Sequence, residues 1–447
     1  MLFTPLASCG SVAHGHISDP SQQTNKENVV SLRSVRLIRA ERALQGETHR
    51  LLLGAGPSDP PLSFNDAERA PRIAVAVGTR PEVIKLAPVC RALEAKGAEV
   101  SVVLTGQHRE LVNDLLSPLE ITRLVDADLD VMQPRQDLSL LAAYLLQGLG
   151  AYLAKSKPDA LIVQGDTTSA FCGALAAFHE RIPVAHVEAG LRSGALENPF
   201  PEELNRQLIS RIGRWQFAPT ARSYEHLTRE GIGAERAELV GNTVVDSLHW
   251  VLQRRLGTSA FSSPGSRRRV LVTLHRRETR GAALTAIASS IAQIARVSDA
   301  EVVFPIHPSP AVREAVHPVL GTQAHVRVCE PLSYFDFVAT LADADLAISD
   351  SGGVQEEAPT LKTPVLVVRE TTERSEALDA GCAILVGTDP TRLQRVALEL
   401  LGDDGRLAAM AATSNPFGDG HAAERIADRL FADLDRSRSR VPAGVAR

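Results

Sequence analysis

Carboxylates and arginines gather in one short part of the chain, behind two apolar runs. Asp166 follows the run Ala160–Val163, and Glu188 follows the run Ile182–Ala185. Short runs that end in charge are typical of buried parallel strands, whose carboxyl ends form the ligand-binding edge of an open α/β sheet. The same segment carries two more glutamates and two arginines: Glu202, Glu203, Arg192 and Arg206. A helix cap would explain one such carboxylate, but the group as a whole favours acid–base chemistry.

The loop Gly78–Glu82 has the composition of an anion-binding site. It joins an apolar run to a helix, and Arg80 and Lys85 add positive charge where the backbone amides of the helix start already favour an anion. Gly78 is its one glycine, so the GxGxxG fingerprint is absent and no dinucleotide cofactor is expected. The alternative is a capped helix with solvated basic side chains.

A similar loop occurs late in the chain, where Ser351, Gly352 and Gly353 follow the apolar run Leu346–Ser349. Adjacent glycines let the backbone approach a diphosphate, and the serine hydroxyl can cap the helix that follows. Further into this helix, the carboxylate of Glu357 could hold the hydroxyls of a ribose. Glycosyltransferases with two Rossmann-like domains bind UDP in this way, and the alternative is an ordinary capped turn.

Other polar side chains follow further apolar runs in the second half of the chain. His275 comes just after Val270–Thr273 and is followed by two arginines. A histidine in such a place suits proton transfer or phosphate binding, and a basic surface cluster is the alternative. Arg374 comes after the run Val365–Val368. His307 comes after the run Glu301–Pro305 and is a weaker candidate than His275.

The elements that must position these residues alternate between apolar runs and helical patterns. Such alternation builds right-handed, doubly wound parallel sheets. It occurs twice, so the predicted fold class is α/β, with two doubly wound Rossmann-like domains that face a cleft. The predicted strands are Ile73–Val77, Val100–Leu104, Ala160–Val163, Val184–Val187, Val270–Thr273, Glu301–Pro305, Val326–Val328, Leu346–Ser349 and Val365–Val368. The predicted helices are Ile84–Ala95, Leu138–Lys155, Ala170–His179, Ala282–Ala295, Phe335–Leu341, Gly353–Thr360 and Pro390–Leu401.

The chain divides into an extension, two domains and a tail. Residues 1–70 hold no strand–helix unit and are expected to form a flexible N-terminal extension. Residues 71–245 are expected to form an N-terminal domain and residues 246–430 a C-terminal one. The division is expected around residues 240–265, where residues 258–269 are rich in Ser, Gly and Pro. The final helix is expected to pack either on the C-terminal domain or back on the N-terminal domain. Residues 431–447 are expected to form a tail.

Composition excludes several classes of function. A net charge of −5 on 447 residues predicts no nucleic-acid or membrane partner, and 4% aromatic residues argue against a base-stacking surface. No apolar run is expected to span a membrane. The 5 cysteines form no CxxC pair, so neither a disulfide framework nor a metal site is expected, and the protein is expected in the cytoplasm.

From Arg72 to about residue 430 the chain resembles the non-hydrolysing UDP-N-acetylglucosamine 2-epimerases, a bacterial family of the GT-B fold. The segments that carry the resemblance are Gly78–Glu82, Thr105–His108, Gly165–Thr168, His186–Arg192, Pro201–Arg206, Val240–Thr243, His275–Glu278, Asp350–Gly353, Glu356–Pro359, Thr371–Arg374 and Asn415–Gly420. Hydrolysing relatives share the fold but differ at the Gly-Gln-His and His-Arg-Arg-Glu segments, which favours the non-hydrolysing branch.

The resemblance implies an isomerase that inverts C2 of UDP-N-acetylglucosamine to give UDP-N-acetylmannosamine, by elimination of UDP to 2-acetamidoglucal and re-addition. It implies the catalytic residues Asp166, Glu188, Glu202 and His275. It implies substrate binding by Arg80, Lys85, His307, Phe337 (against uracil), Ser351, Gly352, Gly353, Glu357 (on the ribose) and Arg374. A UDP-sugar is therefore the expected partner, no cofactor is expected, and the active form is expected to be a homodimer.

A second, regulatory site is implied at Gln107, His108 and Glu110, where many bacterial relatives bind another substrate molecule as an activator. Here Glu110 replaces a glutamine of the family and Tyr144 replaces an arginine. The added negative charge and the lost positive charge both disfavour a second diphosphate. Either this regulation is absent, or the substrate is a modified UDP-2-acetamido sugar.

Three other functions remain as alternatives: a hydrolysing 2-epimerase that releases UDP, a GT-B glycosyltransferase, and a nucleotide-sugar sensor. A glycosyltransferase has no need of three carboxylates in its N-terminal domain, and a sensor would lose them.

Overall fold

The structure is a computed structural model that describes residues 69–107, 109–133, 136–262, 267–274 and 281–439. The extension expected at residues 1–70 falls almost wholly outside these residues, as does the end of the tail expected at residues 431–447.

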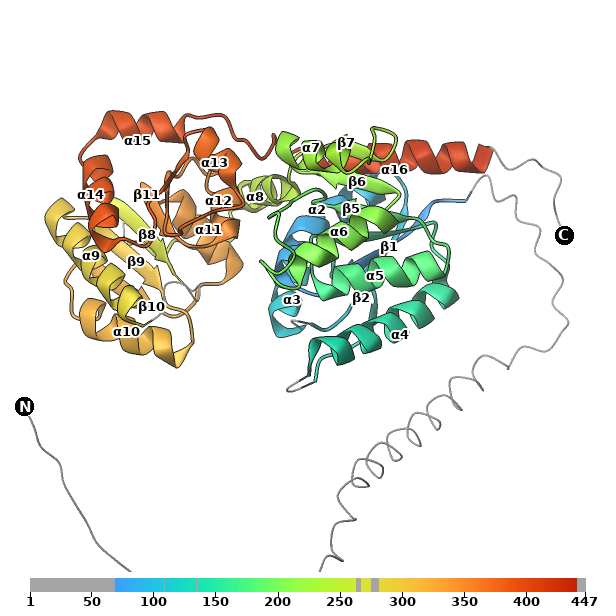
Figure 1. The fold of residues 1–447 in the computed structure, drawn as a ribbon, viewed down its shortest axis with the longest axis horizontal. Coiled ribbons are helices and arrows are strands. Elements are labelled where there is room, and N and C mark those ends of the chain that lie inside the picture. The colour runs from blue at the N-terminus through green and yellow to red at the C-terminus, as the bar shows by residue number, and fades with distance from the viewer. Residues whose placement is uncertain (1–68, 108, 134–135, 263–266, 275–280, 440–447) are drawn as a thin grey trace, which may run out of the picture. The chain divides into compact units, whose positions relative to one another are not determined.

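Among the described residues, a 7-stranded parallel sheet forms the N-terminal domain, in the order β3-β2-β1-β4-β5-β6-β7 (Figure 1). The strands are β1 (Arg72–Val77), β2 (Glu99–Leu104), β3 (Val125–Asp128), β4 (Ala160–Gln164), β5 (Val184–Val187), β6 (Trp215–Ala218) and β7 (Ala237–Leu239). The helices are α2 (Arg80–Ala95), α3 (Arg109–Leu116), α4 (Leu138–Ser156), α5 (Thr168–His179), α6 (Glu202–Ile212), α7 (Ala221–Arg229) and α8 (Thr243–Arg254), with a 3-10 turn at Thr122–Leu124.

The described part of the C-terminal domain holds a 6-stranded parallel sheet in the order β10-β9-β8-β11-β12-β13. The strands are β8 (Arg269–Thr273), β9 (Glu301–Pro305), β10 (Val326–Cys329), β11 (Leu346–Ser349), β12 (Val365–Val367) and β13 (Ala383–Leu385). The helices are α9 (Ala282–Ser298), α10 (Pro310–Leu320), α11 (Tyr334–Ala342), α12 (Gly352–Glu357), α13 (Ser375–Asp379), α14 (Pro390–Leu401), α15 (Asp404–Ala411) and α16 (Ala422–Ser439).

The central strands are mostly apolar, since both faces of each sheet are covered. In β1, Ile73 and Val75 enter one apolar cluster while Ala74 and Ala76 enter another, on the opposite face. In each sheet the chain builds outward from a central strand, β1 or β8, and then returns to continue on its other side. Ligands bind at the carboxyl ends of the strands at such a switch point.

Helix α16 follows the second sheet in sequence but packs on the N-terminal domain. It contacts α2 and α8, and Figure 1 shows it, in red, beside the elements of the N-terminal domain. Its buried residues Ile426 and Leu430 share an apolar cluster with Val244 and Leu248 of α8. The last helix therefore ties the end of the second domain to the first.

The predicted α/β fold class is confirmed, but several elements were not predicted. Strands β3, β7 and β13 end their sheets, and an edge strand needs no continuous apolar run. Strand β6 lies inside its sheet and is fully buried, but it is short and contains Gln216, so it forms no continuous apolar run either. Helix α2 begins at Arg80 rather than Ile84, since Pro81 suits the first turn and Glu82 accepts a hydrogen bond from the backbone of Thr79.

Helix α4 corrects the expectation that no segment has the make-up of a membrane span. By length and composition alone this helix could cross a membrane. Four of its leucines, Leu141, Leu145, Leu149 and Leu153, are nevertheless buried against the sheet and α5, as in the core helix of a globular domain.

Candidate functional site

A cavity of about 550 Å³ opens at the carboxyl ends of both sheets. The N-terminal domain contributes Thr79, Arg80, Glu82, Lys85, Gln164, Asp166, Thr167 and Glu188 to its lining. The C-terminal domain contributes Thr273, Leu274, His307, Tyr334, Phe337, Ser351, Gly353, Glu356, Glu357 and Arg374. The cavity is thus a shared site between the two domains, as expected for two facing Rossmann-like folds.

Lys85 lies at the centre of a buried group of charges in this cavity. Its Nζ donates to Glu188 Oε2 at 2.5 Å and to Glu356 Oε2 at 2.8 Å. Burial opposes the charge of the ammonium group, but the two carboxylates outweigh it and raise the pKa of Lys85. Lys85 is therefore a fixed cation that is already neutralised by protein groups.

Glu356 is held more firmly than Glu188. Its Oε2 also accepts from Asn242 Nδ2 at 3.2 Å, and its Oε1 accepts from Arg374 Nε at 2.8 Å. Burial raises its pKa, but Lys85 and Arg374 outweigh burial and bring the pKa down to about 2. Glu356 is thus a permanent anion of the site.

Glu188 has fewer compensating partners. Besides Lys85, it accepts from Gln164 Nε2 at 2.6 Å, and Arg374 Nη2 lies 3.9 Å from its Oε1. Burial, reinforced by the charge of Glu356, raises the pKa of Glu188 above its ordinary value despite the attraction of Lys85. Its backbone has φ 64°, in the left-handed region that non-glycine residues rarely adopt. Such a residue is typical of a functional site, and a buried carboxylate with a raised pKa is suited to proton exchange.

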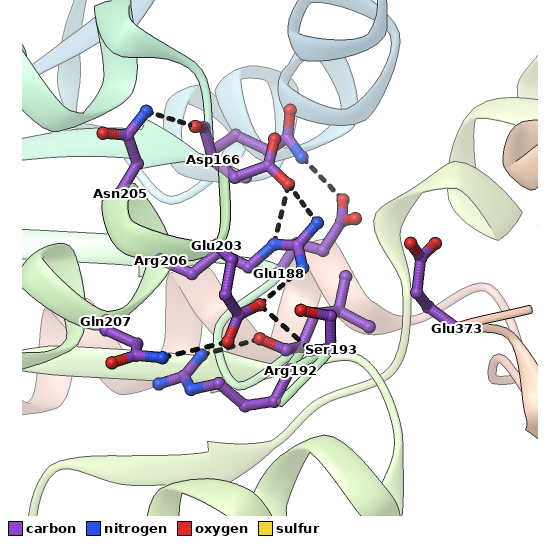
Figure 2. Close-up of polar contacts among 12 residues, drawn as sticks. Asp166, Glu188, Arg192, Ser193, Glu203, Asn205, Arg206, Gln207 and Glu373 are labelled. Atoms are coloured by element: carbon purple, nitrogen blue, oxygen red, sulfur yellow. Dashed lines mark hydrogen bonds and ion pairs between the residues drawn. The ribbon is translucent and has the colours of Figure 1, made fainter. Parts of the chain in front are cut away.

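Asp166 belongs to a second ion-pair group, shown in Figure 2, in which Arg206 lies between two carboxylates. Arg206 Nη2 is 2.6 Å from Asp166 Oδ2, and its Nη1 is 3.0 Å from Glu203 Oε2. Asn205 Nδ2 donates to the Asp166 carbonyl at 2.9 Å, which fixes the backbone there. The Asp166 side chain stays 27% exposed and lines the cavity, so it can reach a ligand while it is oriented from behind.

The two neighbouring glutamates at the start of α6 have different environments. Glu203 is fully buried and also accepts from the Ser193 amide and from Gln207 Nε2 (Figure 2). Glu202, predicted to be catalytic, is half-buried and does not line the cavity. The structure therefore places Asp166 and Glu188 at the cavity, but not Glu202.

The loop after β1 differs from its sequence-based interpretation as an anion site. The amides of Gly78 and Thr79 both donate to Glu82 Oε2 at 2.6 Å, and Thr167 Oγ1 donates to Glu82 Oε1 at 2.6 Å. These two amides are therefore occupied by a protein carboxylate, whose pKa burial raises. Of the charged groups in this segment, Arg80 remains to face an anion in the cavity.

The glycines of the loop after β11 are not required by the fold. A Cβ added at Gly352 would meet Arg374 at 3.6 Å, and one at Gly353 would meet Ser351 Oγ at 3.7 Å, both ordinary contact distances. Neither glycine has a positive φ. Ser351 precedes α12, but its hydroxyl makes no capping hydrogen bond. The open backbone and the uncommitted hydroxyl are consistent with close approach of a ligand.

The remaining wall of the cavity is aromatic and partly polar. The Arg80 guanidinium lies 5.6 Å from the centre of the Tyr334 ring, and Phe337 and His307 also line the cavity. The carboxyl of Glu357 lies on this side, and burial raises its pKa to about 7 against the opposing charge of Arg80.

Several predicted residues lie outside the described part of the chain or away from the cavity. His275 and His108 fall outside the described residues, as does the side chain of Glu110. Gln107 accepts from Ser169 Oγ at 2.8 Å. Arg192 points away and pairs with Glu230 at 2.6 Å.

Sequence reasoning missed Gln164, Tyr334 and the role of Glu356 as a partner of Lys85. Gln164 directly follows the predicted strand Ala160–Val163 and ends the observed β4, so its position offered a signal. Within the described residues, no group of three or more His, Cys, Asp and Glu side chains could hold a metal ion.

Comparison with known proteins gives a consistent result across the described domains. The family profile described as UDP-N-acetylglucosamine 2-epimerase matches residues 91–431. A protein of Salmonella typhimurium named UDP-N-acetylglucosamine 2-epimerase is 42% identical over 370 residues, which cover 80% of this chain and 98% of that relative. A protein of the same name from Bacillus subtilis is 40% identical over 363 residues, or 80% of this chain and 95% of the relative.

Solved structures agree. The UDP-GlcNAc 2-epimerase of Neisseria meningitidis bound to UDP-GlcNAc aligns with a TM-score of 0.75 and 38% identity, over 81% of this chain and 100% of that one. The Methanocaldococcus jannaschii enzyme in complex with UDP-GlcNAc and UDP aligns with a TM-score of 0.67 and 32% identity, over 81% and 99%. The kitacinnamycin glycotransferase, at 16% identity and a TM-score of 0.57, covers 82% of this chain and 99% of its own and shares the fold alone.

Proposed function

Because the chain belongs to the UDP-N-acetylglucosamine 2-epimerase family, we propose that it inverts C2 of UDP-N-acetylglucosamine to give UDP-N-acetylmannosamine without net hydrolysis. The observation that carries the proposal is the pairing, in one cavity, of two differently held carboxylates with a glycine loop that is open to a diphosphate.

The chemistry begins with a proton that is barely acidic. The C2 proton becomes removable when the bond between C1 and the UDP oxygen breaks towards an oxocarbenium-like state. One carboxylate takes the C2 proton, the C1–O electrons leave with UDP, and 2-acetamidoglucal remains. Protonation of C2 from the other face and re-addition of UDP to C1 then give the epimer.

Two carboxylates in unlike environments suit this exchange of a proton on two faces of the sugar. Glu188 is buried and its pKa is raised above the ordinary value, which favours a group that accepts a proton and then returns it. Asp166 is oriented by Arg206 and remains accessible from the cavity. We assign the two proton transfers to this pair.

Departure of UDP requires positive charge on the diphosphate. Arg80 and the backbone at Gly352 and Gly353 are the groups that we assign to it, and Ser351 offers its hydroxyl. We place the uracil against Phe337 and the ribose hydroxyls on Glu357, both of which line the cavity. His275 is retained as a diphosphate ligand on the resemblance alone.

The products distinguish this proposal from hydrolysis. Purified protein incubated with UDP-N-acetylglucosamine and followed by ³¹P and ¹H NMR should reach a stable mixture of two UDP-sugars. Steady accumulation of UDP with free N-acetylmannosamine would instead identify a hydrolysing enzyme, and transfer of the sugar to an added acceptor would identify a glycosyltransferase.

A further inference from the structure

Glu356 connects the two domains inside the cavity wall. It lies on α12 of the C-terminal domain and is 3% exposed. From there it accepts from Lys85 of α2 at 2.8 Å and from Asn242, at the start of α8, at 3.2 Å. Its other oxygen accepts from Arg374 of its own domain at 2.8 Å. Each of these three partners is a donor, and together they fix the position of the carboxylate.

The adjacent glutamate has a different environment, which separates the two roles. Glu357 lies on the side of the cavity with Arg80 and Tyr334, where we assign it to the ribose. Glu356 instead reaches across to Lys85, whose other carboxylate partner is Glu188. Lys85 is therefore held between one carboxylate from each domain.

We propose that Glu356 is a positioning residue for the epimerisation, which holds Lys85 from the second domain and sets the charge around Glu188. This inference rests on the proposed function, in which Glu188 exchanges the C2 proton.

Charged and polar groups from several elements surround Glu188. They are Lys85 on α2, Gln164 at the end of β4, Glu356 on α12 and Arg374 before α13. Two ion pairs of the site, Asp166–Arg206 and Arg374–Glu373, add further charges, and the buried His186 of β5 bonds to the Gly165 carbonyl. Of the described charges that act most strongly on Glu188, Lys85 and Arg374 are cations, and Glu356 is an anion that repels the ionised form of Glu188. Its charge therefore favours the protonated form of Glu188 and, by sharing Lys85, weakens the pull of that cation.

The sign of the expected effect is fixed by this arrangement. In Glu356→Gln the amide oxygen can still accept from Lys85, but the negative charge is lost. Lys85 then keeps Glu188 as its one described carboxylate partner, and the repulsion from Glu356 is gone, so the pKa of Glu188 falls. Since a base must be ionised to act, the acidic limb of kcat/KM should move to lower pH by roughly 1 unit.

The test compares pH profiles of kcat/KM for the wild type, Glu356→Gln and Glu356→Asp. The Asp variant keeps the anion but withdraws it by one methylene, so its acidic limb should lie between the other two; it also serves as the test if the Gln variant does not fold. The matched control is Glu376→Gln, which removes another carboxylate that crosses between the domains, bonded to Thr220 Oγ1 at 2.7 Å. The control should leave the acidic limb in place.

A second measurement separates failure of this inference from failure of the proposed function. The infrared carboxylic C=O band that disappears in Glu188→Gln reports protonation of Glu188 without any turnover. In Glu356→Gln this band should be lost at lower pH than in the wild type. The inference is overturned if, in Glu356→Gln, both the acidic limb of kcat/KM and the infrared band of Glu188 stay at their wild-type pH, whatever the change in kcat. If the wild-type protein forms no epimer, the proposed function is overturned. The pH at which the infrared band is lost would then still show whether Glu356 sets the protonation of Glu188.

Discussion

Lys85 and Glu356 belong to different domains, yet Lys85 Nζ lies 2.8 Å from Glu356 Oε2 in the wall of the cavity. With Glu188 on its other side, the lysine is already compensated by two carboxylates. The sequence suggested Lys85 as a cation for the substrate diphosphate. The structure instead gives it a partner on each side of the cleft, so Arg80 is left as the charged group of that segment that can face the leaving group.

Replacing Lys85 by methionine should destabilise the protein strongly. Two buried carboxylates would lose their shared cation, and breaking a buried pair in this way costs about 3–5 kcal/mol. The measurement is the free energy of unfolding in urea. The control is Lys96→Met, which breaks the exposed pair with Asp428 and should cost at most about 1 kcal/mol. The double variant Lys85→Met with Glu356→Gln should recover part of the lost free energy of unfolding. If Lys85→Met and Lys96→Met lower the free energy of unfolding equally, the buried cluster is contradicted.

The amide variants Asp166→Asn and Glu188→Gln should each lower kcat by ~10²–10⁴ with little change in KM. Both keep size and hydrogen-bonding capacity but lose the ability to exchange a proton. Steady-state kinetics with UDP-N-acetylglucosamine provide the test. Glu202→Gln is the matched comparison, because Glu202 does not line the cavity, and it should retain most of the activity. A large loss of kcat in Glu202→Gln alone would show that a different arrangement is the active one.

Arg80→Ala should weaken UDP binding by about 10- to 100-fold and lower turnover as well, since the diphosphate is charged in the ground state and in the transition state. Ser351→Ala removes a neutral hydroxyl and should weaken binding by roughly 3- to 10-fold. Titration calorimetry with UDP measures both. Arg229→Ala, at a side chain that is 72% exposed, is the control for general loss of positive charge and should bind UDP as the wild type does.

Binding of uridine should tighten as the pH rises through 7. The pKa of Glu357 is raised to about 7 by burial, so the carboxyl is protonated below that pH and ionised above it. Ribose hydroxyls donate to the ionised form more strongly, and uridine carries no phosphate whose own titration would confuse the result. The change in affinity between pH 6 and pH 8 should vanish in Glu357→Gln. A dependence that persists in this variant would assign the effect to another group.

The sequence was sufficient to predict the family, the two parallel sheets and the loops that form the cavity. Its family resemblance is confirmed by the profile match and by relatives of about 42% identity. The central strands were predictable because burial on both faces leaves continuous apolar runs, as in β1 and β4. Since the parallel strands of a sheet end at the same edge, and the two sheets were expected to face one cleft, residues that follow their strands, such as Asp166 and Ser351, could be expected in one cavity.

The pairings within the site could not be predicted. Lys85 and Glu356 are 271 residues apart, and nothing local distinguishes their contact from any other between charged residues. Adjacent carboxylates posed the same difficulty: Glu202 and Glu203 are equivalent in sequence, and only the packing of α6 decides that Glu203 is the buried one. The amides of Gly78 and Thr79 were expected to face an anion, but the nearby carboxylate of Glu82 occupies them.

The central claim is that a protein carboxylate exchanges the C2 proton of the sugar while UDP is detached, and solvent exchange tests it most directly. Purified protein is incubated with UDP-N-acetylglucosamine in deuterated water, and deuterium at C2 is followed by ¹H NMR and mass spectrometry. The account predicts that deuterium enters C2 of both UDP-sugars, and that the rate of exchange falls by ~10²–10⁴ in Glu188→Gln or Asp166→Asn. Formation of an epimer that keeps its original C2 proton, or exchange at the wild-type rate in both variants, would contradict it.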